Sequence, residues 1–98
     1  MEASAEEVLR FIGKIIRKID EKMSGNPIGS KLLSKEEIKI KDLIGIVNKI
    51  AHRYIYYLSE EEREKLNTEK LSPSFWKDLE ILEKEKKIKF YIFMGYIM

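Results

Sequence analysis

The sequence predicts a mainly α-helical protein, a small bundle of three to four helices that ends in a C-terminal apolar segment. Apolar residues recur at intervals of three and four along most of the chain, which is the period of an amphipathic helix. Serine also stands three residues before glutamate at three expected helix starts, which is the spacing of a capping box. Because 98 residues suffice for one core, we expect residues 1–98 to form a single helical domain.

The first helix is expected to begin at Ala5 and to run for about five turns. Ser4 and Glu7 supply its capping box, and the Gly and Pro of residues 24–27 end the pattern. Its apolar stripe consists of Val8, Leu9, Phe11, Ile12, Ile15, Ile16, Ile19 and Met23. Residues 28–33 follow as a connector without a predicted secondary structure.

The second helix is predicted over residues 35–58, opened by a capping box of Ser34 and Glu37. Its broad apolar side consists of Ile40, Leu43, Ile44, Val47, Ile50, Ala51, Tyr54, Ile55 and Leu58. This breadth predicts a helix with nearly half of its circumference buried.

Two shorter helices are expected next. Ser59 and Glu62 form a third capping box and predict a polar helix over residues 60–70. Ser72 followed by Pro73 predicts a further start, because proline is favoured at the first helical position, where its missing N–H does no harm. The apolar stripe of this last helix consists of Phe75, Trp76, Leu79 and Leu82.

The C-terminal residues 88–98 follow a different pattern. They are rich in β-branched and aromatic residues, which favour strands, and a helix here would be apolar on all sides. The composition predicts a β-strand over 88–94, with a buried helical continuation as the alternative. Since an exposed segment this apolar would tend to associate with other protein surfaces, we interpret 88–98 as a docking or oligomerisation tail.

The composition excludes several classes of function. There is no cysteine, so disulfides, thiolate metal sites and thiol nucleophiles are absent. The longest uncharged stretch, residues 90–98, is far shorter than a membrane span, and we expect a cytoplasmic protein without membrane contact or cofactor. The 15 Ile, 15 Lys and 14 Glu beside no Gln resemble the composition of proteins from hyperthermophiles.

His52 is the single histidine and the first candidate for chemistry. It shares the polar face of the second helix with four other side chains, namely Asn48, Lys49, Arg53 and Tyr56. The string 48–54 resembles the helical ribonuclease motif of HEPN domains, in which an Arg-Asn pair precedes the histidine and a tyrosine follows two residues later. Val47 stands where the family has its catalytic arginine. A His-dependent ribonuclease is therefore only a remote alternative, and the polar face is interpreted as a solvent-facing seam of a protein without catalytic residues.

Basic residues form two candidate surfaces for nucleic acid. The net charge of +2 is too small for a general polyanion-binding field, so only local patches could bind phosphates. The first patch, on the first helix, consists of Arg10, Lys14, Arg17 and Lys18. The second consists of Lys84, Lys86, Lys87 and Lys89. Neighbouring glutamates interrupt both, which is typical of a solvated, salt-bridged surface.

The sequence thus favours a non-catalytic helical interaction subunit that self-associates or docks onto a larger complex. Its partner is expected to be a protein or a second copy, with nucleic-acid binding as the alternative. Aromatic residues and Met are enriched at interface centres, and the tail is rich in both. The predicted interface consists of Ile88, Phe90, Tyr91, Ile92, Phe93, Met94, Tyr96 and Ile97.

Overall fold

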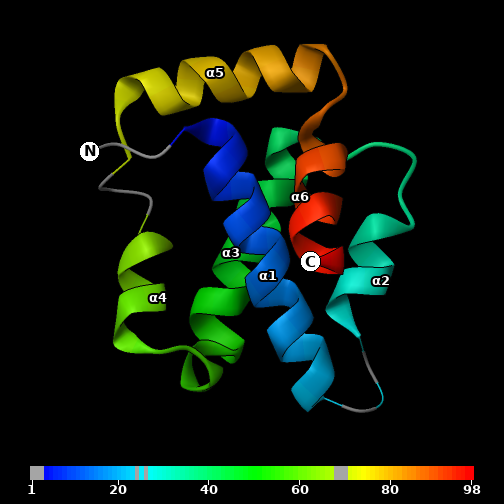
Figure 1. Ribbon diagram of the computed structural model, residues 1–98, viewed down its shortest axis with the longest axis vertical. Coiled ribbons are helices and arrows are strands. Elements are labelled where there is room, and N and C mark those ends of the chain that lie inside the picture. Colours follow the sequence, from blue (N-terminus) through cyan, green and yellow to red (C-terminus); the bar gives the residue numbers. More distant parts are fainter. Residues whose placement is uncertain (1–3, 24, 26, 68–70) are drawn as a thin grey trace.

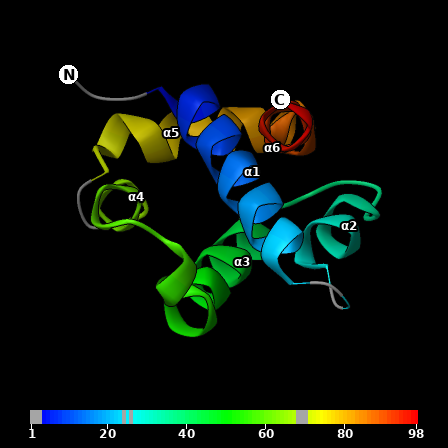
Figure 2. The same cartoon turned by 60° about the horizontal axis from the view of Figure 1, so that its bottom comes forward.

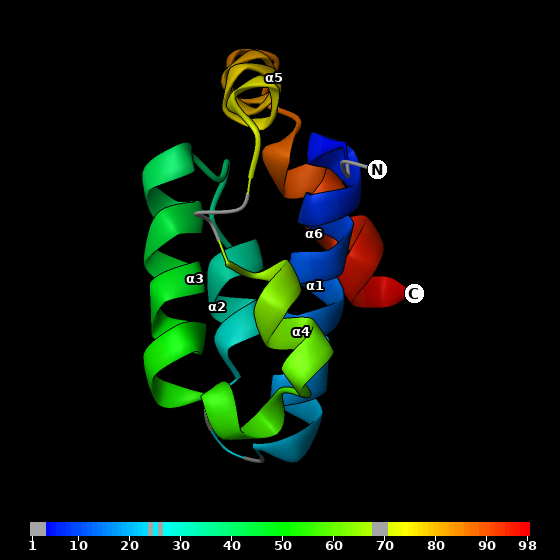
Figure 3. The same ribbon diagram turned by 90° about the vertical axis from the view of Figure 1, so that its left-hand side faces the viewer.

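The computed structural model describes residues 4–23, 25, 27–67 and 71–98, and within these ranges all regular structure is helical (Figure 1). The elements are α1 (Ala5–Lys22), α2 (Ile28–Leu33), α3 (Ile40–Arg53), the 3-10 helix η1 (Ile55–Tyr57), α4 (Glu60–Lys65), α5 (Pro73–Lys84) and α6 (Ile88–Ile97). The predicted mainly α-helical class is confirmed, with more and shorter helices than expected. Figure 3 shows α3 and α6 on opposite sides of the molecule with α1 between them, and α5 across one end.

Helix α1 is the centre of the hydrophobic core. Its cap forms as predicted, since the Ser4 hydroxyl accepts a hydrogen bond of 3.2 Å from the Glu7 amide. The side chains of Leu9, Ile16 and Ile19 are fully buried. In Figure 2, α1 crosses the middle of the molecule among the other helices. The apolar stripe therefore supplies the surface against which the neighbouring helices pack.

The predicted second helix begins and ends elsewhere. The 28–33 connector is the short helix α2, and Ser34 lies at its end, where its hydroxyl donates to the Lys31 carbonyl at 2.8 Å. Helix α3 begins only at Ile40, whose amide donates to the Glu83 carboxylate of α5 at 2.6 Å. The preceding Lys39 amide donates to the Asp42 carboxylate within α3 at 2.9 Å. The helix cap therefore lies at Lys39, and the predicted Ser34 and Glu37 capping box is not used.

The end of α3 also differs from the prediction. The α-helix stops at Arg53, and the chain continues through η1, although Tyr54 and Leu58 stay buried as the stripe required. Two predicted apolar positions, Ile44 and Ala51, are exposed. The buried face of α3 is therefore narrower than its sequence suggested.

The remaining helix starts agree with their capping signals. In α4, Ser59 and Glu62 form the predicted reciprocal box, with bonds of 3.1 and 2.8 Å. In α5, Ser72 caps the Phe75 amide at 3.3 Å and Pro73 occupies the first turn. Helix α4 ends at Lys65, and positions 68–70 of the predicted longer helix lie outside the described residues.

The predicted β-strand over 88–94 is wrong, because this segment forms helix α6. Ile88 and Ile92 are fully buried and lie on one helical face with the buried Gly95, and α6 makes the most extensive helix–helix contacts of the fold, with α1. Packing on α1 overrides the strand preference of β-branched and aromatic residues, which have no second strand to pair with among the described residues. The tail is thus part of the core on one side.

A tight turn folds α6 back from α5. Lys86 adopts a left-handed conformation with φ of 59°, and the Lys86 and Lys87 amides donate to the carbonyls of Glu83 and Leu82 at 3.0 and 2.8 Å. These two bonds form a Schellman motif, which ends α5 within one turn. Helix α6 can therefore begin at Ile88, directly beside the core.

Two glycines bring α1 and α6 into backbone contact. A Cβ atom on Gly13 would overlap the Ile92 carbonyl oxygen, and one on Gly95 would overlap the carbonyl of Arg10. Because these obstacles are backbone atoms, no side-chain rotation can make room. The close approach of the two helices requires glycine at both positions.

Asp20 joins α2 and α6 to the end of α1. Its carboxylate accepts from the amides of Ile28 at 2.8 Å and Gly29 at 2.9 Å, which satisfies the free N–H groups at the start of α2. The Tyr96 hydroxyl of α6 donates to the same carboxylate at 2.8 Å. This hydrogen bond, with partial burial and the charge of Asp20, raises the pKa of the Tyr96 phenol above 10.0.

The glycine contact predicts large effects from adding one methyl group. We expect Gly13→Ala and Gly95→Ala each to lower the free energy of unfolding by about 3 kcal/mol, because the helices must separate to admit a Cβ. Gly45→Ala is the matched control, since a Cβ there meets nothing within 4 Å, and it should stabilise α3 by about 0.5–1 kcal/mol. Urea unfolding followed by circular dichroism measures all three, and equal stability of Gly95→Ala and Gly45→Ala would contradict the contact.

Candidate functional site

Helix α6 has two apolar faces with different environments. Ile88, Ile92 and Gly95 are buried against the core, whereas Phe90, Phe93 and Ile97 are 54%, 45% and 54% exposed. At about 100° per residue, the exposed three fall within roughly 60° of one another, on the side opposite the buried three. With the adjoining Met98, which is 71% exposed, they form a patch that we call the α6 surface.

The α6 surface borders a hollow with charged walls. This hollow is lined by Phe90 and Phe93 together with Lys86, Lys89, Glu36 and Glu37. The glutamates belong to the segment between α2 and α3, which the Lys89 ammonium holds by donating to the Lys35 carbonyl at 2.6 Å. Sequence reasoning missed these two glutamates, because they are far from α6 in the chain and only the fold brings them beside it.

The predicted interface residues separate into three groups. Ile88 and Ile92 are in the core, and this corrects their assignment as partner contacts, because a partner cannot reach them in the folded chain. Tyr91, Tyr96 and Met94 are half-buried. The Arg10 guanidinium lies over the Tyr91 ring, with its Cζ atom 5.8 Å from the ring centroid. Phe90, Phe93 and Ile97 remain exposed on the α6 surface.

The basic residues of α1 are largely engaged within the chain. Arg17 pairs with Glu21 at 3.0 Å, and Lys18 pairs with Glu62 of α4 at 2.7 Å. Arg10 lies over Tyr91, so Lys14 alone of the four is an exposed cation without a carboxylate partner among the described residues. The row does not form a continuous cationic surface.

The C-terminal lysines are similarly divided. Lys87 lies 3.8 Å from Glu85, and Lys89 is held by the Lys35 carbonyl. Lys84 and Lys86 are exposed and form no ion pair with the described carboxylates. The nucleic-acid interpretation therefore depends on Lys14, Lys84 and Lys86, which lie on separate helices or turns.

The polar face around His52 is largely open to solvent. Asn48, His52, Arg53 and Tyr56 are exposed, and Lys49 is half-buried. The imidazole of His52 makes no hydrogen bond or ion pair with the described part of the chain. No cluster of three metal-ligating side chains occurs among the described residues, and no helix there is both long and apolar enough to cross a bilayer.

Comparisons with protein-family models, with curated proteins and with solved structures find no match to this chain.

The Lys18–Glu62 pair joins α1 to α4 and makes this contact sensitive to acid. Partial burial raises the pKa of the Glu62 carboxyl, but hydrogen bonds from Lys18 and Ser59 together with the Lys18 charge outweigh it and lower the pKa below 4.5. As the pH falls, the unfolded chain therefore takes up this proton before the folded chain does. The stability that the pair contributes is present above about pH 4.5 and is lost as the pH falls through the lower, folded pKa.

This linkage predicts that Glu62→Gln flattens the acid limb of the stability profile. Between pH 7 and pH 3 the variant should lose less unfolding free energy than the unmodified chain, and at pH 7 it should be less stable by about 1 kcal/mol. Glu60→Gln is the control, because Glu60 is exposed and forms no ion pair within the described ranges. Urea titrations at several pH values measure the effect, and identical profiles for the two variants would show that the pair contributes nothing.

Proposed function

We propose that this protein is a non-catalytic helical interaction subunit that self-associates through the α6 surface. The observation that carries the proposal is the exposure of Phe90, Phe93 and Ile97 on a helix whose opposite face is fixed in the core. A helix that is apolar on all sides is normally buried on all sides. Removing such a face from water is favourable, by up to about 1.5–3 kcal/mol for each large apolar side chain.

The backbone contact between α1 and α6 favours this role for α6. Because Gly13 and Gly95 hold the two helices together, α6 cannot turn its exposed face inward without losing the packing of Ile88 and Ile92. The α6 surface is therefore a rigid, preformed patch. Preformed patches bind at a lower entropic cost than segments that must first become ordered.

The charges beside the α6 surface favour a second copy as the occupant. In a two-fold symmetric dimer the same patch meets itself, so the patch must be complementary to itself. The hollow at Phe90 and Phe93 carries cations on one wall, Lys86 and Lys89, and anions on the other, Glu36 and Glu37. A two-fold axis that lies in the interface, perpendicular to the line between the two walls, brings the cationic wall of one copy toward the anionic wall of the other, which is attractive for both copies.

Introducing a charge on the α6 surface should abolish self-association. We expect the unmodified chain to be at least dimeric at micromolar concentration, and Phe93→Glu to be monomeric under the same conditions with its helical circular dichroism intact. Tyr56→Glu is the control, because Tyr56 is 90% exposed on η1, outside the α6 surface, and its substitution should leave the dimer unchanged. Sedimentation equilibrium measures the mass, and a monomeric unmodified chain would refute self-association.

A charge exchange tests the two-fold arrangement itself. Glu36 and Lys86 form no ion pair within the described part of one chain, so either can be reversed without breaking an internal bond. Glu36→Lys alone should weaken the dimer at least tenfold, and adding Lys86→Glu should restore most of the affinity at low salt. A double variant as weak as the single one would exclude the proposed register.

A further inference from the structure

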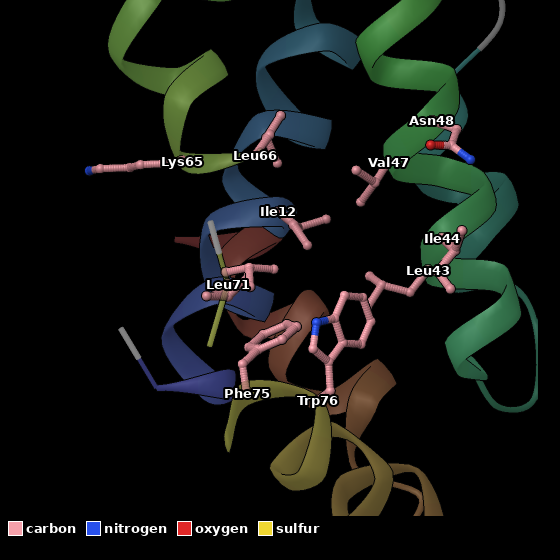
Figure 4. Close-up of a pocket in the computed structure, with 11 residues that line it drawn as sticks. Ile12, Leu43, Ile44, Val47, Asn48, Lys65, Leu66, Leu71, Phe75 and Trp76 are labelled. Carbon is pink, nitrogen blue, oxygen red and sulfur yellow. The ribbon is translucent and has the colours of Figure 1, made fainter. Parts of the chain in front are cut away.

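A second feature of the fold, separate from the α6 surface, is an apolar pocket where α5 crosses the ends of α1 and α3. The pocket has a volume of about 210 Å³. Figure 4 shows the side chains of Ile12, Leu43, Val47, Leu66, Phe75 and Trp76 around it, contributed by four helices and their ends. It opens to the surface beside the exposed side chains of Ile44, Asn48 and Lys65, and it shares none of its lining with the hollow beside α6.

The arrangement of the helices explains why this space is not filled. Helix α5 lies across the end of the molecule instead of along α1 and α3, as Figure 1 shows, so its side chains reach the space from one side only. Phe75 and Trp76 enter it as an edge-to-face pair with ring centroids 5.2 Å apart. Two aromatic rings at the mouth of a gap between packed helices leave a defined recess.

The size and lining of the recess favour a small apolar molecule over water. Water needs two to four polar partners to occupy a cavity, and an apolar cavity of about 150 Å³ stays dry and binds benzene. By the same proportion, a space of 210 Å³ takes a molecule of about eight non-hydrogen atoms. A bound molecule would also restore dispersion contacts that the lining lacks.

The polar groups at the pocket restrict the class of ligand. Lys65 lines the edge, but its ammonium lies 5.4 Å from the Phe11 ring centroid and 4.0 Å from Glu61, and in Figure 4 its side chain extends away from the other lining residues. No cation therefore faces the recess to hold a carboxylate. The amide side chain of Asn48 also lines the pocket, at an exposed position on α3. The indole N–H of Trp76 has no hydrogen-bond acceptor among the described residues, so a ligand at the indole ring meets a free donor there.

From these observations we infer that the pocket binds a small neutral aromatic molecule that carries one hydrogen-bond acceptor. The aromatic body fills the apolar recess between α1, α3 and α5. Its acceptor, a hydroxyl or carbonyl oxygen, takes the hydrogen bond of the Trp76 indole. A charged group is excluded, because burial in this lining would cost more than one neutral donor returns.

Trp76 is the single tryptophan of the chain and reports directly on binding. We expect benzyl alcohol to cause a saturable shift of the Trp76 indole N–H resonance in the unmodified chain. Toluene should bind at least threefold more weakly because it lacks an acceptor, and benzoate at least tenfold more weakly because it is charged. No saturable shift with benzyl alcohol, or tighter binding of benzoate, would overturn the inference.

Two variants locate the ligand and its hydrogen bond. Leu66 is half-buried at the edge of the pocket, and in Leu66→Phe the larger side chain fills part of the space. This variant should abolish the benzyl alcohol shift while retaining cooperative unfolding. Trp76→Phe keeps an aromatic wall but lacks the donor, so the melting temperature should rise equally with benzyl alcohol and with toluene. An unchanged shift in Leu66→Phe, or a retained preference for benzyl alcohol in Trp76→Phe, would contradict the proposed site.

The titration is repeated in Phe93→Glu to keep this result independent of self-association. Equal affinity in the unmodified chain and in this variant is the expected result, since the two surfaces share no residue. If benzyl alcohol instead competes with association of the unmodified chain, the pocket accepts a side chain of a partner copy, and the small-molecule inference is wrong.

Discussion

The contact between α1 and α6 at Gly13 and Gly95 is the constraint on which the rest of the fold depends. Because neither glycine has a Cβ, the two backbones meet directly. The contact joins two glycines that are more than 80 positions apart in the sequence. This close approach seals Ile88 and Ile92 against the α1 stripe. It also brings Tyr96 within reach of Asp20, whose carboxylate in turn starts α2.

The same constraint shapes both proposed sites. Because one face of α6 is fixed on α1, its other face must remain outward, and Phe90, Phe93 and Ile97 stay exposed unless a second copy covers them. The turn at Lys86 that permits this placement also directs α5 across the end of the bundle. A helix that crosses the bundle in this way cannot fill the space between α1 and α3, which leaves the pocket beside Trp76.

Local signals in the sequence predicted what local chemistry controls. The caps at Ser4, Ser59 and Ser72 form because each serine bonds to an amide three residues later. Only part of the start of α3 is local chemistry, since the Lys39 amide bonds to Asp42 three residues later, whereas the Ile40 amide bonds to Glu83, 43 residues away. The strand predicted at 88–94 failed for the same reason, because partner helices decide the conformation of so apolar a segment. Composition identified the aromatic residues of the α6 surface. The position of the glutamates beside that surface, and the formation of the pocket, depend on tertiary contacts that the sequence pattern does not show.

Hydrogen exchange of the α6 amides tests most directly whether α6 is an integral part of the core. If the glycine contact holds the fold together, the amides of Ile92 and its neighbours exchange only through global unfolding, with the same protection free energy as the central amides of α1. This equality should persist in the monomeric Phe93→Glu variant, where no partner copy protects the helix. Exchange of the α6 amides through a local opening, while α1 stays protected, would show that α6 is a detachable tail and would contradict the account.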